Sequence, residues 1–111
     1  MRAEMIYDTA VMLAGRDIYN EYIEDNDYQK RRAVFLINQV LLELSLPLIV
    51  SLNENITAEP KFIDALCYGT ARLIAVSASD AVTANTLTET YNAKRAAALC
   101  SITTIKNRIP V

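Results

Sequence analysis

The sequence predicts an all-α protein, a small bundle of about four helices with a long C-terminal helix, in a single domain covering residues 1–111. Two observations predict helices throughout. The chain has only two glycines but many alanines and leucines, which are strong helix formers. Apolar residues also recur every three or four positions along most of the chain. With 111 residues, 52% of them hydrophobic, the chain is long enough to bury a core without disulfides or a metal.

The first helix is expected from about Ala3 to Ala14. Its apolar stripe consists of Ile6, Ala10 and Leu13. Gly15 is placed to end it. Residues 16–25 are crowded with charge and tyrosine, and they fit either a further helical turn or a loop.

The second helix is expected from Asn26, which can form a capping box with Gln29, to about Leu44. Its apolar residues cover more than one face. They leave a narrow polar stripe of Arg32, Gln39 and Glu43, so the helix is expected to be covered on nearly all sides. Residues 33–52 contain Glu43 and Pro47, which argues for a buried helix and a loop, not a membrane span.

An irregular connection with room for a short extended piece at residues 48–50 leads to the third helix, expected from Pro60 to about Ser77. Two neighbouring stripes of this helix are apolar. The polar stripe is thin and consists of Lys61, Asp64, Tyr68 and Arg72, spaced so that each can touch the next. Gly69 in mid-helix predicts the close approach of another backbone.

The fourth helix follows a break at Ser79-Asp80 and is expected from about Ala81 to Lys106. Its small residues let a neighbouring helix come close. The tail from Arg108 to Val111 is short and apolar, and we expect it to dock on another surface.

The second and third helices offer more apolar face than a small core requires. Oligomerisation would cover the excess in a chain with no large cofactor. The alternative is that the other two helices sandwich these two. Periodicity does not separate the two interpretations.

The composition lacks the usual parts of most catalytic sites. There is no histidine, the two cysteines cannot complete a four-thiolate site, and the two glycines lie too far apart for a phosphate-binding loop. We therefore expect no enzyme, no cofactor and no metal. Cys67 and Cys100 lie in apolar helical contexts and are expected to be free buried thiols. The N-terminus lacks the apolar stretch of a signal peptide.

The net charge of −2 is unevenly distributed. Glu89 is the last acidic side chain, and the four residues Lys94, Arg95, Lys106 and Arg108 make the C-terminal part basic. These residues fit either a solvated complement to the helix dipole or a docking surface for an acidic partner.

Two stretches resemble the small helical head-tail connector proteins of tailed bacteriophages. The run Ser51–Ile56, Pro60 and Ile63–Leu73 is similar to a loop that leads into a helix of the form "DAL.YG.A..L". The stretch Tyr91–Ala96 resembles the family's "YN.KRA". The resemblance covers residues 46–106, whereas the N-terminal helices fit only in length and apolar character.

The resemblance implies a structural virion protein, also called an adaptor or head-completion protein. Such a protein joins the portal vertex as a homo-oligomeric ring, lengthens the DNA channel and receives the stopper and tail proteins. The expected location is the virion neck, after assembly in the host bacterial cytoplasm. Duplex DNA would be only non-specific channel content, and the acidic balance fits a wall that does not grip phosphates.

The resemblance also suggests roles for individual residues. Asp64 and Arg72 are candidates for holding the third helix in register with a neighbour, the alternative being an ordinary surface network. Lys94 and Arg95 would face the channel or an adjoining subunit. Lys106, Arg108 and Ile109 would reach the portal. The early tyrosines are candidates for a contact patch or for the core: Tyr7, Tyr19, Tyr22 and Tyr28.

Two other classes of function compete with this interpretation. A small helical DNA-binding regulator of a phage or mobile element would need a recognition helix, for which Asn85, Asn92, Lys94 and Arg95 are the nearest match. An enzyme would have to use a carboxylate group made of Asp64, Asp80 and Glu89, for which no partner is evident.

Overall fold

Four helices make up the structure, which is a computed structural model that describes residues 1–16 and 27–108, with side chains to Cys100. The helices are α1 (Ala3–Leu13), α3 (Asp27–Glu43), α4 (Pro60–Ser77) and α5 (Ala81–Arg108). The predicted all-α class is confirmed, and each described boundary lies within two residues of its expected place. The proposed cap at Asn26 lies outside the described residues.

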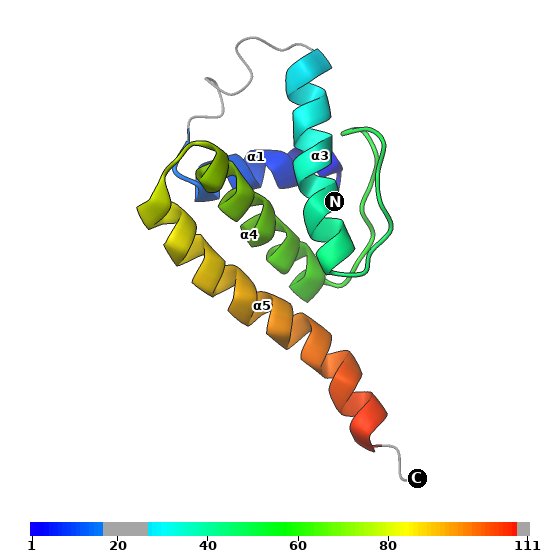
Figure 1. Ribbon diagram of the computed structural model, residues 1–111. Coiled ribbons are helices and arrows are strands. Elements are labelled where there is room, and N and C mark those ends of the chain that lie inside the picture. Colours follow the sequence, from blue (N-terminus) through cyan, green and yellow to red (C-terminus); the bar gives the residue numbers. More distant parts are fainter. Residues whose placement is uncertain (17–26, 109–111) are drawn as a thin grey trace.

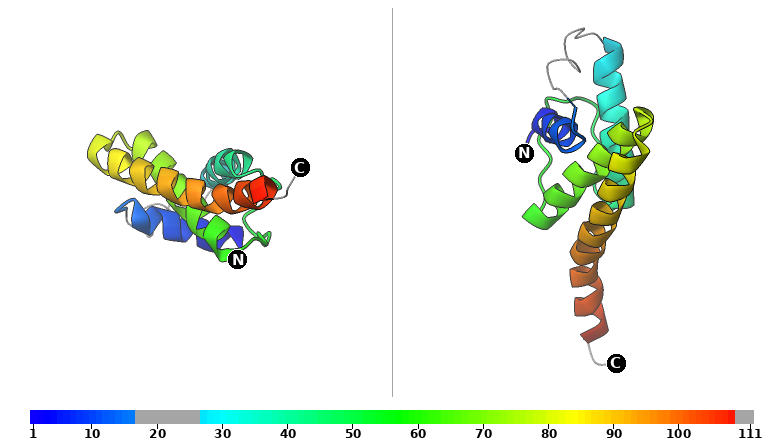
Figure 2. Two further views of the ribbon diagram at one scale, coloured as in Figure 1. Left: turned by 90° about the horizontal axis from the view of Figure 1, so that it is seen from below. Right: turned by 90° about the vertical axis from the view of Figure 1, so that its left-hand side faces the viewer.

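Helix α4 is the centre of the bundle, because it packs against each of the other three helices. Helix α5 folds back along α4, and α1 packs across α4 with little contact to α3 (Figure 1). Both views in Figure 2 show α1 on one side of the molecule and α3 with α5 on the other. The last turns of α5 project beyond the rest of the bundle (Figure 1).

Three helices end with a residue in the left-handed conformation. These residues are Gly15 after α1 (φ 74°), Ser45 after α3 (φ 59°) and Ser79 after α4 (φ 58°). The backbone N–H that follows each of them donates to a carbonyl five residues earlier, as in a Schellman motif. Glycine adopts this conformation without strain, whereas the two serines carry a Cβ into an unfavourable region. The Asp80 carboxylate then caps α5 by accepting from the Thr83 N–H (3.2 Å), and hydrogen bonds from the Thr83 side chain and backbone lower the pKa of Asp80.

Side chains brace the connection between α3 and α4. Asn38 pairs with both backbone groups of Ile49, since its amide nitrogen donates to the carbonyl and its amide oxygen accepts from the N–H, each at 2.9 Å. The Glu54 carboxylate accepts from the N–H groups of Val50 (2.6 Å) and Ser51 (2.8 Å). The stretch in which the sequence allowed a short extended piece is therefore a loop. Hydrogen bonds hold this loop to α3 and to itself.

The first residues of the chain fasten the same loop from the other side. The Ile56 N–H donates to the Met1 carbonyl (2.8 Å), and the Ala3 N–H donates to the Glu54 carbonyl (2.9 Å). An isolated β-bridge joins Arg2 and Asn55 between them. The start of α1 and the approach to α4 are thus fixed relative to each other.

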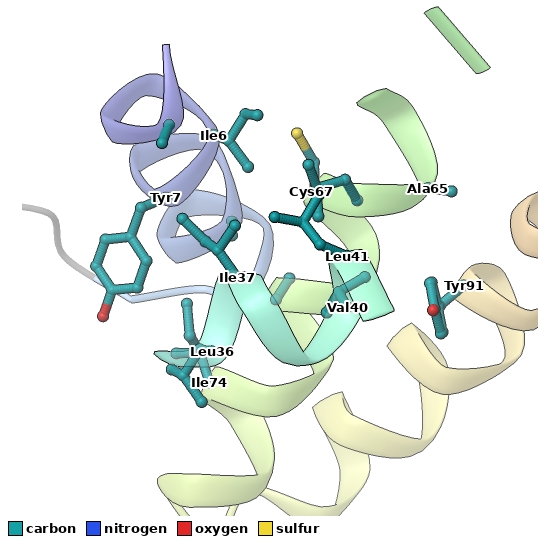
Figure 3. Packing of buried hydrophobic residues seen from close by; sticks show 14 of the residues in the cluster. Ile6, Tyr7, Leu36, Ile37, Val40, Leu41, Ala65, Cys67, Ile74 and Tyr91 are labelled. Atoms are coloured by element: carbon teal, nitrogen blue, oxygen red, sulfur yellow. The ribbon is translucent and has the colours of Figure 1, made fainter. Parts of the chain in front are cut away.

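One apolar core fills the space between the helices (Figure 3). Its large side chains, each under 2% exposed, include Ile6 and Val11 of α1, Ile37, Val40 and Leu41 of α3, Leu66 and Ile74 of α4, and Tyr91 of α5. The one buried polar side chain among the described residues, Thr70, donates to the Leu66 carbonyl (2.9 Å).

The extra apolar faces of α3 and α4 differ in whether other helices cover them. Both apolar stripes of α4 are largely covered, one of them by α1. Helix α3, however, exposes Tyr28 (65%), Phe35 (61%) and Leu42 (63%), so the expectation that it is covered on nearly all sides is wrong. The sandwich interpretation holds for α4, while α3 keeps an uncovered apolar face.

Two further expectations are corrected. Cys67 is buried but Cys100 is exposed. Tyr7 belongs to the core whereas Tyr28 is exposed, so these two tyrosines form no common patch; Tyr19 and Tyr22 lie outside the described residues. Within the described chain, no helix is both long and apolar enough to span a membrane.

We expect Ser45→Gly and Ser79→Gly each to raise the free energy of unfolding by about 0.5 kcal/mol. Removing Cβ relieves the left-handed strain, and the greater freedom of glycine in the unfolded chain offsets part of the gain. Chemical denaturation of each variant measures the change. Gly15→Ala is the control, because nothing lies within 4 Å of the added methyl group and only the backbone strain should lower stability. Unchanged or lower stability in both glycine variants would contradict this account.

Candidate functional site

The contact between α4 and α5 is built around Gly69, against which the ring of Tyr91 packs. A Cβ placed on Gly69 would lie 2.6 Å from Val40 Cγ1 and 2.7 Å from Tyr91 Cε1. The prediction that another backbone approaches Gly69 is therefore wrong. Two large side chains, one from α3 and one from α5, fill the space that a side chain at this position would occupy.

The hydroxyl of Tyr91 reaches from this contact to a cluster of charged side chains, Glu43, Arg72 and Arg95. Tyr91 donates to Glu43 Oε1 (2.6 Å), and Arg72 Nη2 contacts Glu43 Oε2 (3.5 Å). The Arg72 guanidinium also lies over the Tyr91 ring, 5.1 Å from its centroid. We call these four residues the Glu43 cluster, and it joins α3, α4 and α5 at one point.

Burial and the Glu43 carboxylate raise the pKa of the Tyr91 hydroxyl above its ordinary value of 10.0, while the positive charges of Arg95 and Arg72 act in the opposite direction. Tyr91 therefore remains a neutral hydrogen-bond donor at physiological pH. Because the ring is 1% exposed, this hydroxyl serves as an internal tie between helices.

A second charged pair lies towards the start of α4. Lys94 Nζ donates to Asp64 Oδ2 (2.6 Å) and lies 4.9 Å from the centroid of the Tyr68 ring. Both charged side chains are partly exposed, so the pair adds little stability. The pair joins α5 to the first part of α4, three residues after Tyr91.

The structure assigns partners to most of the predicted site residues. Asp64 and Arg72 do not form a network along α4; each binds a different helix of its own chain. Lys94 is engaged by Asp64, and Arg95 is half-buried beside Tyr91. Lys106 and Arg108 lie on the projecting end of α5, where only the backbone is described, and Ile109 lies outside the described residues.

Two of the three carboxylates considered for an enzyme, Asp64 and Asp80, are not brought together. Asp64 lies near the start of α4, and Asp80 follows the end of the same helix. At 1.5 Å per residue, the stretch of helix from Asp64 to its end is about 20 Å long. Asp64 is paired with Lys94, and Asp80 caps α5. In the part of the chain that the structure describes, no group of three potential metal ligands occurs.

The sequence interpretation missed the roles of Glu43, Tyr91 and Asn38. The sequence places Glu43 in the narrow polar stripe of its helix, but it does not identify Tyr91 as the partner of Glu43. Asn38 stands among apolar residues, where a polar group needs hydrogen bonds. The available signal in the sequence was a polar residue within an otherwise apolar helix. That signal does not identify the partner, because Tyr91 is 48 residues away from Glu43 in the sequence.

Helices α1 and α3 each expose large apolar side chains on the face that points away from the core. The α1 face exposes Met5 (53%) and Met12 (59%), and the α3 face exposes Tyr28, Phe35 and Leu42. The exposed apolar residues on each face are seven positions apart, so they line up along one side of the helix. Other apolar side chains are exposed singly: Leu48, Val50, Val76 and Val82.

No protein-family model, curated protein or solved structure matches this chain.

We expect Gly69→Ala to lower the free energy of unfolding by about 2 kcal/mol. The methyl group overpacks the contact with Val40 and Tyr91, and this cost exceeds the gain in helix propensity of about 1 kcal/mol. Chemical denaturation measures the loss. In a Val40→Ala background the cost should shrink, because one of the two obstructing side chains is removed. An equal cost in both backgrounds would show that the close contact is not its source.

We expect the protein to lose stability as the pH rises from 9 to 11. Burial, aided by the charge of Asp64, raises the pKa of the Cys67 thiol from 9.0 to about 11. In this window the unfolded thiol has ionised while the folded one keeps its proton, so ionisation favours the unfolded state. Cys67→Ala should recover up to about 2 kcal/mol of this loss, as measured by denaturation at each pH. Cys100→Ala, at an exposed position, should leave the pH profile unchanged.

Proposed function

We propose that this protein is a structural subunit of a bacteriophage head-tail connector. In this role it joins the portal vertex as a ring of identical copies, extends the DNA channel and receives the proteins of the neck and tail. No reaction is part of this function. The task of the fold is to present fixed surfaces to its neighbours.

The main support is that the two stretches carrying the resemblance pack on each other. The "DAL.YG.A..L" stretch supplies Asp64 and Gly69 from α4, and the "YN.KRA" stretch supplies Tyr91 and Lys94 from α5. Tyr91 fits against Gly69, and Lys94 binds Asp64. Motif residues that are distant in sequence thus build one helix contact, which supports treating the two stretches as one structural unit.

Two features of the surface agree with a ring subunit. The outward faces of α1 and α3 present apolar side chains that another protein would cover. Helix α5 projects beyond the bundle with its basic end, as a segment that reaches a partner would (Figure 1).

The DNA-binding alternative is less well supported by the site. Of the four side chains assigned to a recognition face, Lys94 is held by Asp64 and Arg95 is half-buried beside Tyr91. Reading base edges requires such side chains to extend freely from one helix face.

The test is to mix the purified protein with portal rings from the genome that encodes it, and to compare particles by light scattering and negative-stain imaging. We expect an additional ring of density on the portal. A protein that stays monomeric, never binds portals and forms no ring would refute the proposal.

Removing the basic charges of the C-terminal end should weaken this binding. We expect the Lys106→Ala, Arg108→Ala double variant to bind portals at least about tenfold more weakly, equivalent to roughly 1.4 kcal/mol. Lys61→Ala is the control, since it removes a positive charge from a different helix, where Lys61 lies 3.4 Å from the Glu59 carboxylate. Equal losses in both would indicate a general effect of charge instead of a specific contact.

A further inference from the structure

We infer that Arg72 and Arg95 form a binding site for a carboxylate group that comes from outside this chain. Both arginines belong to the Glu43 cluster, where α3, α4 and α5 meet. The inference goes beyond the proposed function and does not rest on it, because it depends only on the charges that this fold brings together.

The fold places both arginines next to Tyr91. Arg95 follows Tyr91 by four residues, so their side chains lie on the same side of α5. Arg72 follows Gly69 by three residues on α4, and Tyr91 packs against Gly69. Burial and Glu43 raise the pKa of the Tyr91 hydroxyl, and the charges of Arg95 and Arg72 both act against this rise. Both guanidinium groups are therefore close enough to the hydroxyl to influence it.

The cluster holds two positive charges and one negative charge. The two oxygens of Glu43 are both engaged, since Oε1 accepts from Tyr91 (2.6 Å) and Oε2 contacts Arg72 (3.5 Å). Arg95 forms no ion pair with any residue whose side chain the structure describes. Neither arginine has an acidic residue three or four positions away on its own helix, and α5 has no acidic residue after Glu89. The described chain thus supplies one carboxylate for two guanidinium groups.

Partial burial makes this imbalance costly. The Arg72 side chain is 23% exposed, and Arg95 is half-buried. The Nε atoms of both arginines are buried, and no acceptor for them lies within the described residues. Like charges that are partly removed from water repel each other and lose hydration, and a bound anion would offset both costs. Because Arg72 and Glu43 remain partly exposed, an anion can reach the cluster from solvent.

The chemistry of the cluster favours a carboxylate over other anions. Guanidinium is a planar fork of N–H donors that matches the two oxygens of a carboxylate. One negative charge would balance the cluster, whereas a phosphate dianion would exceed its net positive charge. Duplex DNA requires several basic contacts, but Lys94, next to Arg95 in the sequence, is already paired with Asp64. An acidic side chain of another protein and a small carboxylic acid both supply the required group.

Titration followed by NMR tests the site. Because the Nε–H groups of Arg72 and Arg95 are buried, they should exchange slowly with water and give observable signals. The isotope-labelled protein is titrated with sodium acetate at constant ionic strength, against sodium chloride as the reference anion. A second series uses a blocked tripeptide with one central glutamate. We expect both signals to shift and to saturate with a dissociation constant of about 10 mM, as for a single charge-assisted contact.

The comparison of the two carboxylates identifies the source of the group. Tighter binding of the tripeptide would assign the site to an acidic side chain of a partner protein. Equal or tighter binding of acetate would assign it to a small carboxylic acid. Either result supports the inference, because both require the two arginines to recognise a carboxylate.

Matched variants show whether the arginines are responsible. Arg95→Gln removes one guanidinium and should weaken acetate binding at least about tenfold. Arg95→Lys keeps the charge but loses the planar fork, so its binding should be intermediate. Arg2→Gln is the control, because Arg2 is an exposed arginine that pairs with Glu4, and it should leave acetate binding unchanged. Backbone amide spectra confirm that each variant is folded.

The inference would be overturned by shifts that do not saturate, that chloride reproduces, or that persist in both Arg95 variants. Saturation by inorganic phosphate or by a short DNA duplex, but not by acetate, would also overturn it. No portal takes part in this experiment, so its failure leaves the proposed function standing. Failure of the portal-binding test likewise leaves the carboxylate site standing.

Discussion

The close packing of Tyr91 against Gly69 is the interaction on which the rest of the structure depends. It brings α5 onto α4 with the side chain of Val40 beside them, and it carries the Tyr91 hydroxyl to Glu43 on α3. One residue thereby sets the distance between two helices and ties in a third. Because overpacking a dense core is as costly as leaving a cavity, the absence of a side chain at position 69 is what permits this geometry.

The polar contacts around this point determine orientation more than stability. Arg72 bridges Glu43 and the Tyr91 ring, while Lys94 binds Asp64 one turn further along α5. Partly exposed ion pairs contribute little free energy; here one pair joins α4 to α3 and the other joins α4 to α5. With the Tyr91 hydroxyl, these side chains connect α3, α4 and α5.

The excess of apolar residues can be interpreted only when it is known which of them form the core. Helix α4 lies in the middle, so its second apolar stripe is covered by α1. Helix α3 lies at the edge, and its second stripe remains exposed as Tyr28, Phe35 and Leu42. With Met5 and Met12 exposed on α1, the fold leaves apolar side chains uncovered on both of these helices.

The sequence by itself determined the helical class, the order of the elements and their ends. These depend on local properties: the spacing of apolar residues, the proline at the start of α4, and the break at Ser79-Asp80. It also singled out Asp64, Arg72 and Lys94, although not their partners. Only the tertiary structure decided that Asp64 meets Lys94, that Glu43 turns inward to Tyr91, and that α4 rather than α3 is enclosed. Those outcomes depend on which helix packs beside which, and periodicity within one helix carries no information about its neighbours.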